Sequence, residues 1–325
     1  MSDLKMVQLV SFRNAAGDLG FFQKDGNHVY LSLRQQGSLH VISEANSWQA
    51  WSEYSQAVQK NGDTAEITTD AIRYYLIRHA ETIDIEIVEM HAIKNPGAYY
   101  PRIAREKIHF NYVSNEFQQD IRAYRTIQEG LDTLFNYIEP TAHNLNVYGH
   151  KIRELLILSC TEVEHLLLKM LTDNGYARKD RYSTNDYIKC KEILGLGEYK
   201  TILNSYRDLK IFQPFASWCK KSPTQTLPWY NAYNAVKHNR SDNIQSANLE
   251  HLLDAISAIH ILLESQYGQG IFQRWTSRTD DRSIFNTTTA PRWRCDQVQA
   301  PIFVLGWEMK YEWPERRKYF EDHAE

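Results

Sequence analysis

The sequence predicts an α+β protein, mainly α, whose helical part forms an antiparallel bundle. Apolar residues alternate in short runs before about residue 112 and again near the C-terminus, whereas between 113 and 270 they recur every three or four residues over long stretches. Long helices with short connections favour an up-and-down bundle. We therefore expect three parts: a mixed α/β region at 1–112, a helical bundle at 113–270 and a C-terminal segment at 271–325.

The N-terminal region combines short β-rich runs, separated by Gly and Asn, with two helical patterns. The predicted strands are Met6–Phe12, His28–Leu33, Leu39–Ser43 and Thr82–Val88, and the predicted helices are Ser47–Lys60 and Glu66–Ala80. Asn95–Tyr100, NPGAYY, predicts a turn. Because this region has no glycine-rich phosphate loop and no paired-aspartate signature, its role stays unassigned.

The central region is a series of amphipathic helical patterns. They are Glu116–Tyr137, Tyr148–Thr172, Thr184–Leu194, Gly197–Leu209, a helix that begins at Pro228, and Ala247–Tyr267. Glu162, Glu164 and His165 interrupt the most hydrophobic of these helices. A buried carboxylate needs a partner, so one of the two glutamates is expected to face a polar or basic group, such as Lys237 or Arg240, unless both point to solvent. His165 is expected to be structural rather than a ligand.

The C-terminal segment is rich in arginine and tryptophan and then becomes β-like. Trp307–Trp313 alternates apolar and charged residues, which predicts a strand. Ile302–Leu305 pairs either with that strand as a hairpin or with the N-terminal strands. We favour the second arrangement, which joins both ends of the chain in one sheet-containing domain, because an isolated hairpin is marginal in water.

Composition limits the classes of function. The 325 residues are 42% hydrophobic and 24% charged, with a net charge of −3, so any nucleic-acid contact requires a local basic patch. No two of the four cysteines have CxxC spacing, so we expect no metal site and no cofactor. The sequence shows neither a signal peptide nor an apolar run of the ~20 residues that a membrane span needs, so we expect a cytoplasmic protein without membrane contact.

The stretch Trp229–Arg240, WYNAYNAVKHNR, carries the most specific pattern in the chain. At about 100° per residue, an apolar face that includes Tyr233 lies opposite a polar face that carries Asn234 and His238. Asn234 and His238 are four residues apart, so their side chains are neighbours, and Lys237 lies beside them. An amide, an imidazole and an ammonium on one face can bind and polarise an anion. The same face would also suit a helix that is simply solvated.

This stretch resembles the HEPN helical domains, many of which are metal-independent ribonucleases of bacterial conflict systems. Their motif is an Arg, a polar residue that is often Asn, and a His; Asn234 and His238 match the last two. The string AYNAVKHNR is also similar to a HEPN subgroup with "AYN..KH.R" in its third long helix. Tyr233 departs from the motif because it occupies the arginine position, and Lys237 or Arg240 would have to supply the missing positive charge. The resemblance covers about Glu116–Gly268.

The resemblance implies an endoribonuclease of a defence or toxin-type system, in which His238 transfers protons and Asn234 orients His238 or the phosphate. Our own hypothesis is that Lys237 and Arg240 stabilise charge on the phosphate. It also implies a homodimer, since the family's site lies between two protomers, and leaves room for an antitoxin or sensor partner. Arginines beside aromatic residues can bind phosphates and stack on bases, although they also suit an ordinary surface. The expected RNA-binding residues are Tyr233, Arg274, Arg278, Arg282 and Arg292.

The alternative from a different class is a non-catalytic RNA- or nucleotide-binding or dimerisation module built on the same helix. Tyr233 in place of arginine favours this alternative, because a binding module does not need the complete catalytic motif. The two hypotheses differ in one observable, which is whether the protein generates RNA fragments in the presence of EDTA.

Overall fold

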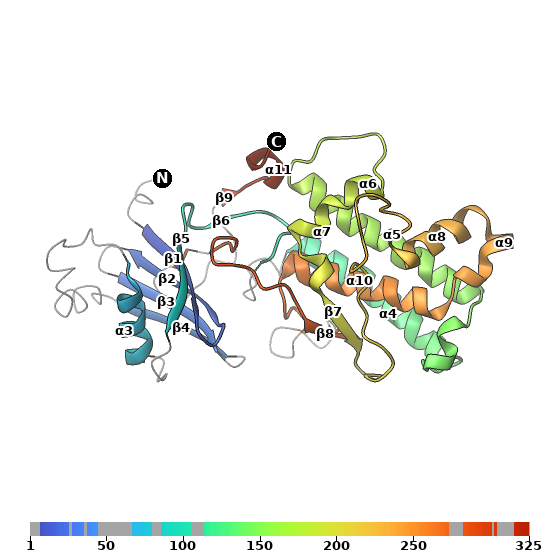
Figure 1. Ribbon diagram of the computed structural model, residues 1–325, viewed down its shortest axis with the longest axis horizontal. Helices are drawn as coiled ribbons and strands as arrows, with labels where there is room; N and C mark the ends of the chain where they lie inside the picture. Colours follow the sequence, from blue (N-terminus) through green and yellow to red (C-terminus); the bar gives the residue numbers. More distant parts are fainter. Residues whose placement is uncertain are drawn as a thin grey trace. The chain divides into compact units, whose positions relative to one another are not determined.

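The computed structural model describes residues 7–25, 28–35, 38–44, 67–79, 86–105, 114–272, 282–300, 302–303 and 315–324. The chain forms two compact units (Figure 1). One unit comprises Met1–Tyr99 and Trp293–Arg316, and the other comprises Tyr100–Arg292 and Arg317–Glu325. The prediction of mixed α and β structure with an N-terminal sheet is confirmed.

The first unit is built on a five-stranded sheet in the order β4-β3-β2-β1-β5, in which all neighbouring strands are antiparallel. Its elements are β1 (Val7–Asn14), β2 (Leu19–Asp25), β3 (His28–Gln35), β4 (Ser38–Glu44), helix α3 (Thr69–His79) and β5 (Ile87–Ala92). A two-residue parallel pairing joins β6 (Ala98–Tyr99) to β9 (Glu315–Arg316). Strand β2 was not among the predicted strands, and β5 begins near the end of the predicted strand Thr82–Val88, of which residues 82–85 lie outside the described residues.

Both faces of this sheet are covered. Ile72 and Tyr75 of α3 pack against one face, in a cluster that includes Phe12 and Phe22. The C-terminal segment covers the other face, where Gln23 exchanges two hydrogen bonds with the backbone of Phe303 (2.8 and 2.9 Å). The N-terminal region therefore shares one unit with Trp293–Arg316, whereas Arg317–Glu325 belongs to the other unit. The predicted strand Trp307–Trp313 and the predicted helix Ser47–Lys60 lie outside the described residues.

One glycine in the sheet is required by close packing. Gly20 of β2 lies opposite Phe12 of β1, and a Cβ on Gly20 would come within 2.3 Å of the Phe12 ring. A side chain at this position would displace a fully buried aromatic ring, so the β1–β2 pairing favours glycine here.

The second unit is mainly helical and packs around its last long helix, α10 (Figure 1). Its α-helices are α4 (Asn115–Phe135), α5 (His150–Asp173), α6 (Thr184–Tyr187), α7 (Lys189–Ile193), α8 (Pro228–His238), α9 (Arg240–Asn243), α10 (Leu249–Tyr267) and α11 (Tyr319–Asp322). It also contains the 3-10 turns η3 (Ala142–Asn146), η4 (Leu196–Glu198) and η5 (Ile244–Ser246), and the strands β7 (Lys200–Leu203) and β8 (Phe285–Thr289).

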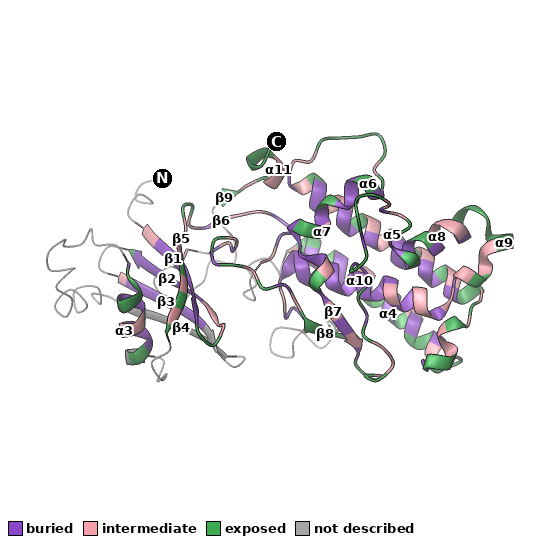
Figure 2. Cartoon of the chain, viewed as in Figure 1, coloured by how far each residue is buried: buried purple, intermediate pink, exposed green. Residues whose placement is uncertain are grey.

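Helix α10 is central because it is buried on almost every side. Every residue from Ala255 to Tyr267 is buried, and Figure 2 shows α10 as mostly buried. A helix of this kind needs neighbours all round, and α4, α5 and α8 pack against it. The sequence predicted a single apolar stripe; the structure shows instead that the whole C-terminal half of α10 is enclosed.

The predicted helix Gly197–Leu209 is wrong. After the η4 turn, residues 200–203 form β7, which pairs antiparallel with β8 more than 80 residues later in the sequence. Thr201 is fully buried and its hydroxyl bonds to Ser257 of α10 at 2.8 Å. The apolar spacing of this stretch suits a helix, but the backbone hydrogen bonds offered by β8 select a strand, and β-partners at such a separation leave no local signal.

The boundaries of the two units differ from the predicted division at residues 112 and 270. Residues 100–105 pack with the helical unit, where Arg102 forms ion pairs with Asp120 and Asp173. The C-terminal segment is divided, because residues 293–303 pack with the sheet and the helix α11 packs with the helical unit. Among the described residues, no helix is both long and apolar enough to cross a membrane.

Candidate functional site on helix α8

Helix α8 begins and ends where the sequence indicates. Pro228 occupies the first turn, where its missing N–H is not needed, after Leu227 in extended conformation. The apolar face is buried, and Trp229 donates from Nε1 to the carbonyl oxygen of Pro214 (3.0 Å). This packing fixes the rotation of α8, so its opposite face is turned outward.

The outward face of α8 carries the predicted polar residues. Lys237 and His238 are exposed and Asn234 is partly exposed. In the described part of the chain, the side chains of Asn234 and His238 have no hydrogen-bond or ion-pair partner, so they are available to a ligand. An imidazole, an amide and an ammonium within one turn and a half of helix can bind a phosphate and exchange a proton with it.

Tyr233 has a different role from the predicted one. Its ring is 1% exposed and lies in the core, so it offers no surface for stacking on an RNA base. Its hydroxyl accepts a hydrogen bond from Lys237 Nζ (2.7 Å), and the ammonium also lies 4.8 Å from the centre of the ring. The hydrogen bond, followed by the Coulombic effect of the Tyr233 hydroxyl and the nearby Glu164, raises the pKa of Lys237, so this side chain stays charged. Tyr233 therefore positions the lysine instead of contacting RNA.

The chain turns immediately after α8, and this turn keeps Arg240 at the surface. Helix α8 ends at His238, and Arg240 begins the separate helix α9 with an exposed side chain. A continuous helix would have carried Arg240 to the Trp229 side. Asn239 marks the break between the two helices, and its side-chain amide donates to Asp242 (2.8 Å).

The structure adds one cation that sequence reasoning missed. Arg153 of α5 donates from Nε and Nη2 to the carbonyl oxygen of Val236, 3.3 Å in each case. This places a guanidinium at the C-terminal end of α8, next to the segment that contains Lys237 and His238. The sequence could have indicated that Arg153 faces α8. Arg153 lies 11 residues, or three helical turns, before Glu164, so the two side chains lie on the same face of α5.

Glu164 has the polar partner that the sequence predicted for one of the two glutamates. Tyr230 of α8 donates its hydroxyl hydrogen to Glu164 Oε1. Burial, followed by this hydrogen bond, raises the pKa of Tyr230, so the phenol stays protonated and remains a donor. The contact links α5 to α8 beneath the exposed face, and it is a structural contact because Tyr230 is buried.

Two of the four predicted tail arginines, Arg282 and Arg292, lie in the described part of the chain. Arg274 and Arg278 lie outside the described residues. Arg282 and Arg292 are exposed, and the carbonyl oxygen of Arg282 accepts from Gln128 of α4 (3.1 Å). Among the described contacts, no hydrogen bond or ion pair joins Arg282 or Arg292 to α8.

A second histidine, His260 of α10, lies in a closed polar network. Its Nδ1 is 2.8 Å from Ser283 Oγ, its Nε2 is 2.9 Å from Thr287 Oγ1, and the Thr287 hydroxyl donates to Glu264. His260 is 1% exposed and stacks on Phe272, and burial lowers the pKa of His260 to about 3. The neutral His260 imidazole links β8 to α10 through its hydrogen bond to Thr287, and its burial makes it inaccessible to a substrate.

The contacts described above position α8 through residues of this one chain. No family model, no curated protein and no solved structure matches this sequence.

Proposed function

We propose that the helical unit is a HEPN-like, metal-independent endoribonuclease whose phosphate site is the outward face of α8. The observation that carries the proposal is the set of accessible side chains at the C-terminal end of this helix: Asn234 and His238 have no partner in the described chain, and Lys237 is held beside them by a buried tyrosine. This arrangement offers a proton-transfer group and a fixed positive charge within reach of one phosphate.

Each side chain has a distinct role in the proposed reaction. His238 exchanges the proton of the 2′-hydroxyl or of the leaving 5′-oxygen, because imidazole titrates near neutral pH. Lys237 stabilises the negative charge that develops on the phosphate. Arg240 follows α8 in the chain and Arg153 binds the carbonyl oxygen of Val236 on α8, and one of these two guanidinium groups supplies the charge that the motif arginine would carry in a HEPN nuclease.

Two protomers complete the proposed site. A single α8 carries one His238, whereas cleavage of RNA without a metal ion uses one group as base and another as acid. A homodimer that brings two copies of α8 together supplies both groups. An antitoxin or sensor partner would act on this dimer.

The competing proposal is a binding module that holds RNA or a nucleotide on the same face without cleaving it. Tyr233 supports the binding module. It occupies the position of the motif arginine, and its buried side chain binds Lys237, so this position offers no guanidinium to a phosphate. Both proposals require an accessible α8 face and a nucleic-acid ligand. Only the nuclease requires proton transfer by His238.

The test is incubation of the purified chain with a panel of labelled RNAs in the presence of EDTA, followed by analysis of the fragment ends. The nuclease proposal predicts 2′,3′-cyclic phosphate ends, loss of cleavage in His238→Ala, and unchanged cleavage in His143→Ala, an exposed histidine on η3. RNA binding that is equal in wild type and His238→Ala, without fragments, supports the binding module. Cleavage by a folded His238→Ala protein excludes the proposed mechanism.

A further inference from the structure

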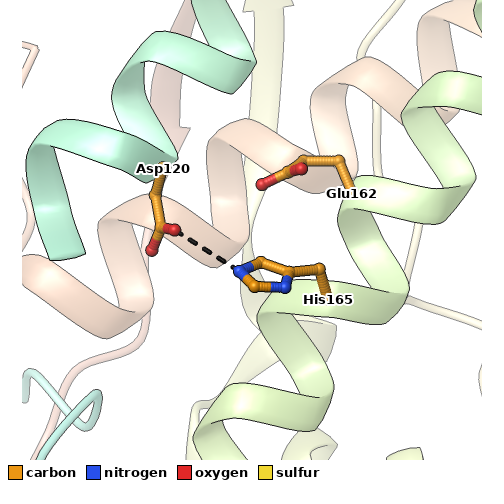
Figure 3. Close-up of side chains that lie close together, drawn as sticks. All are labelled: Asp120, Glu162 and His165. Atoms are coloured by element: carbon orange, nitrogen blue, oxygen red, sulfur yellow. Dashed lines mark ion pairs between the residues drawn. The ribbon is translucent and has the colours of Figure 1, made fainter.

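Helix α5 carries a second group of potential ligands on the side that faces α4. Asp120 of α4 and Glu162 and His165 of α5 each offer one ligand atom, and these three atoms lie within 4.8 Å of one another. Figure 3 shows the three side chains converging from the two neighbouring helices. Glu162 and His165 are three residues apart on one helix, so both point toward the same place.

The two oxygens of the Asp120 carboxylate have different partners. Arg102 Nη1 (2.9 Å) and the Tyr267 hydroxyl (2.6 Å) both bind Asp120 Oδ2, so the other carboxylate oxygen, Oδ1, is left for His165. Oδ1 is 3.6 Å from His165 Nε2, which is longer than a hydrogen bond.

One oxygen of the Glu162 carboxylate lacks a hydrogen-bond partner in the described part of the chain. This atom, Oε1, is buried. A buried carboxylate oxygen without a donor is costly, and a bound cation is one way to satisfy it. This observation is independent of the distances within the group, and it indicates a ligand that the polypeptide itself does not supply.

The distances fit a small ion with nitrogen and oxygen ligands. Zn²⁺ binds His nitrogen and carboxylate oxygen at about 2.0–2.1 Å, so the edges of its coordination tetrahedron are ~3.3 Å long. The observed 3.6 Å between His165 Nε2 and Asp120 Oδ1 is close to such an edge. A rotamer adjustment of Glu162 would bring the third ligand in, because its carboxylate already lies within 4.8 Å of the other two.

We propose that Asp120, Glu162 and His165 bind one divalent metal ion of the zinc class. Three protein ligands leave at least one coordination position for water, and the His165 side chain, which is 49% exposed, opens this position to solvent. Arg102 and Tyr267 fix the orientation of the Asp120 carboxylate, as outer-shell partners do in metal sites. This proposal departs from the sequence-based expectations that the chain holds no metal ion and that His165 is structural.

The local charge agrees with a dication. With His165 neutral, three carboxylates (Asp120, Glu162 and Asp173) face two cations, Arg102 and Lys169, whose ion pairs use Asp120 and Asp173. With Glu162 ionised, the group has one negative charge in excess, and this charge lies on Glu162. The competing arrangement has no metal, and a protonated His165 balances the carboxylates instead.

The experiment is a titration of the full chain with Co²⁺, whose visible spectrum reports coordination, followed by displacement with Zn²⁺. Cys219 is exposed and would bind either ion, so all proteins carry Cys219→Ser, and they are first treated with a chelator and dialysed. The test variants are Glu162→Gln and His165→Ala. The matched controls are Glu154→Gln and His150→Ala, which remove the same groups from exposed positions on the same helix.

The proposal predicts saturable binding of one equivalent with visible bands in the wild type and both controls. Glu162→Gln and His165→Ala should weaken it by more than about tenfold, since even outer-shell partners are worth ten- to a hundredfold. Glu162→Gln keeps the shape of the side chain and removes an unpaired charge, so it folds, and Zn²⁺ should raise the thermal transition of the wild type but not of this variant.

Absence of saturable binding, or equal affinity in wild type and the two test variants, overturns the site and leaves protonated His165 as the balancing charge. Because the titration contains no RNA, its result is independent of the proposed nuclease activity.

Discussion

The two sides of helix α5 show different uses of polar residues. Toward α8, Arg153 and Glu164 each contact one residue of the motif helix, and above these contacts Asn234 and His238 remain free at the surface. Toward α4, Arg102, Asp120 and Asp173 are largely enclosed and each makes at least two polar contacts, while Glu162 Oε1 has no hydrogen-bond partner in the described chain. Glu164 and His165 are consecutive in the chain and yet belong to different sides, because successive residues on a helix are about 100° apart.

The difference has an energetic consequence. A side chain that is free at the surface contributes little to stability, so evolution can use it for chemistry. A buried ion pair contributes little net stability, but removing one partner leaves an uncompensated charge. The α4 side of α5 should therefore be sensitive to single substitutions that the α8 side tolerates, and the following predictions test this contrast.

The largest effect is expected at Arg102. Its side chain is 3% exposed and binds Asp120, Asp173 and Gln266, and these contacts hold its backbone at a φ of 57°, in the left-handed region. Arg102→Ala should lower the free energy of unfolding by about 3–5 kcal/mol, because the buried Asp120 carboxylate loses its arginine and Asp173 keeps only Lys169. Chemical denaturation measures the change, and Arg122→Ala, an exposed arginine on α4, is the control. Equal stability of the two variants would contradict the contrast.

The second effect is a pH dependence from α10. Burial raises the pKa of Glu264 to about 7, above the 4.5 of an ordinary glutamate. Between pH 4.5 and 7 the folded Glu264 keeps a proton that the unfolded chain has released, so this group lowers stability by about 3 kcal/mol in total as pH rises. Below about pH 6.5 the buried neutral His260 contributes a slope of the opposite sign. The stability difference between wild type and Glu264→Gln should therefore change by about 3 kcal/mol in denaturation series from pH 4.5 to 7.5. Ser265→Ala, at another buried position of α10, should be less stable but keep the pH dependence of the wild type.

A smaller effect is expected where the core meets the functional face. Tyr233→Phe keeps the buried ring and removes the hydroxyl that accepts from Lys237. The loss of this hydrogen bond should lower the free energy of unfolding by about 1 kcal/mol. The effect is small because the Lys237 ammonium is exposed and water replaces the hydroxyl group. If Lys237 acts at the phosphate, RNA affinity or cleavage should fall as well. Lys237→Met reports the loss of the charge itself, and a Tyr233→Phe protein with full RNA activity would show that the lysine needs no positioning.

The smallest effect on stability is expected at His238. His238→Ala removes an exposed side chain that has no partner in the described chain, so the free energy of unfolding should change by no more than about 0.5 kcal/mol. RNA cleavage should nevertheless be lost. A marked drop in the thermal transition would mean that His238 supports the fold, and the proposed division between the two sides of α5 would then be wrong.

The sequence alone determined the elements whose signals are local. Pro228 and the spacing of Trp229, Tyr233 and Val236 predicted where α8 begins and which of its faces is buried, and both predictions agree with the structure. The long helices α4, α5 and α10 and the strands β1 and β3 were found because a core-facing helix or strand repeats its pattern over many residues. The exposure of Lys237 and His238 followed from the same periodicity.

Only the tertiary structure decided the contacts between distant segments. Strand β7 exists because β8 pairs with it from more than 80 residues away, and the local spacing suggested a helix instead. Tyr233 was expected to contact RNA until its burial beneath Lys237 was visible. Asp120, Glu162 and His165 meet because α4 packs on α5, and Arg102 joins them from a loop. The sequence specifies which chemical groups the chain carries. Which of these groups face one another depends on how the helices pack, and hydrophobic periodicity does not predict that packing.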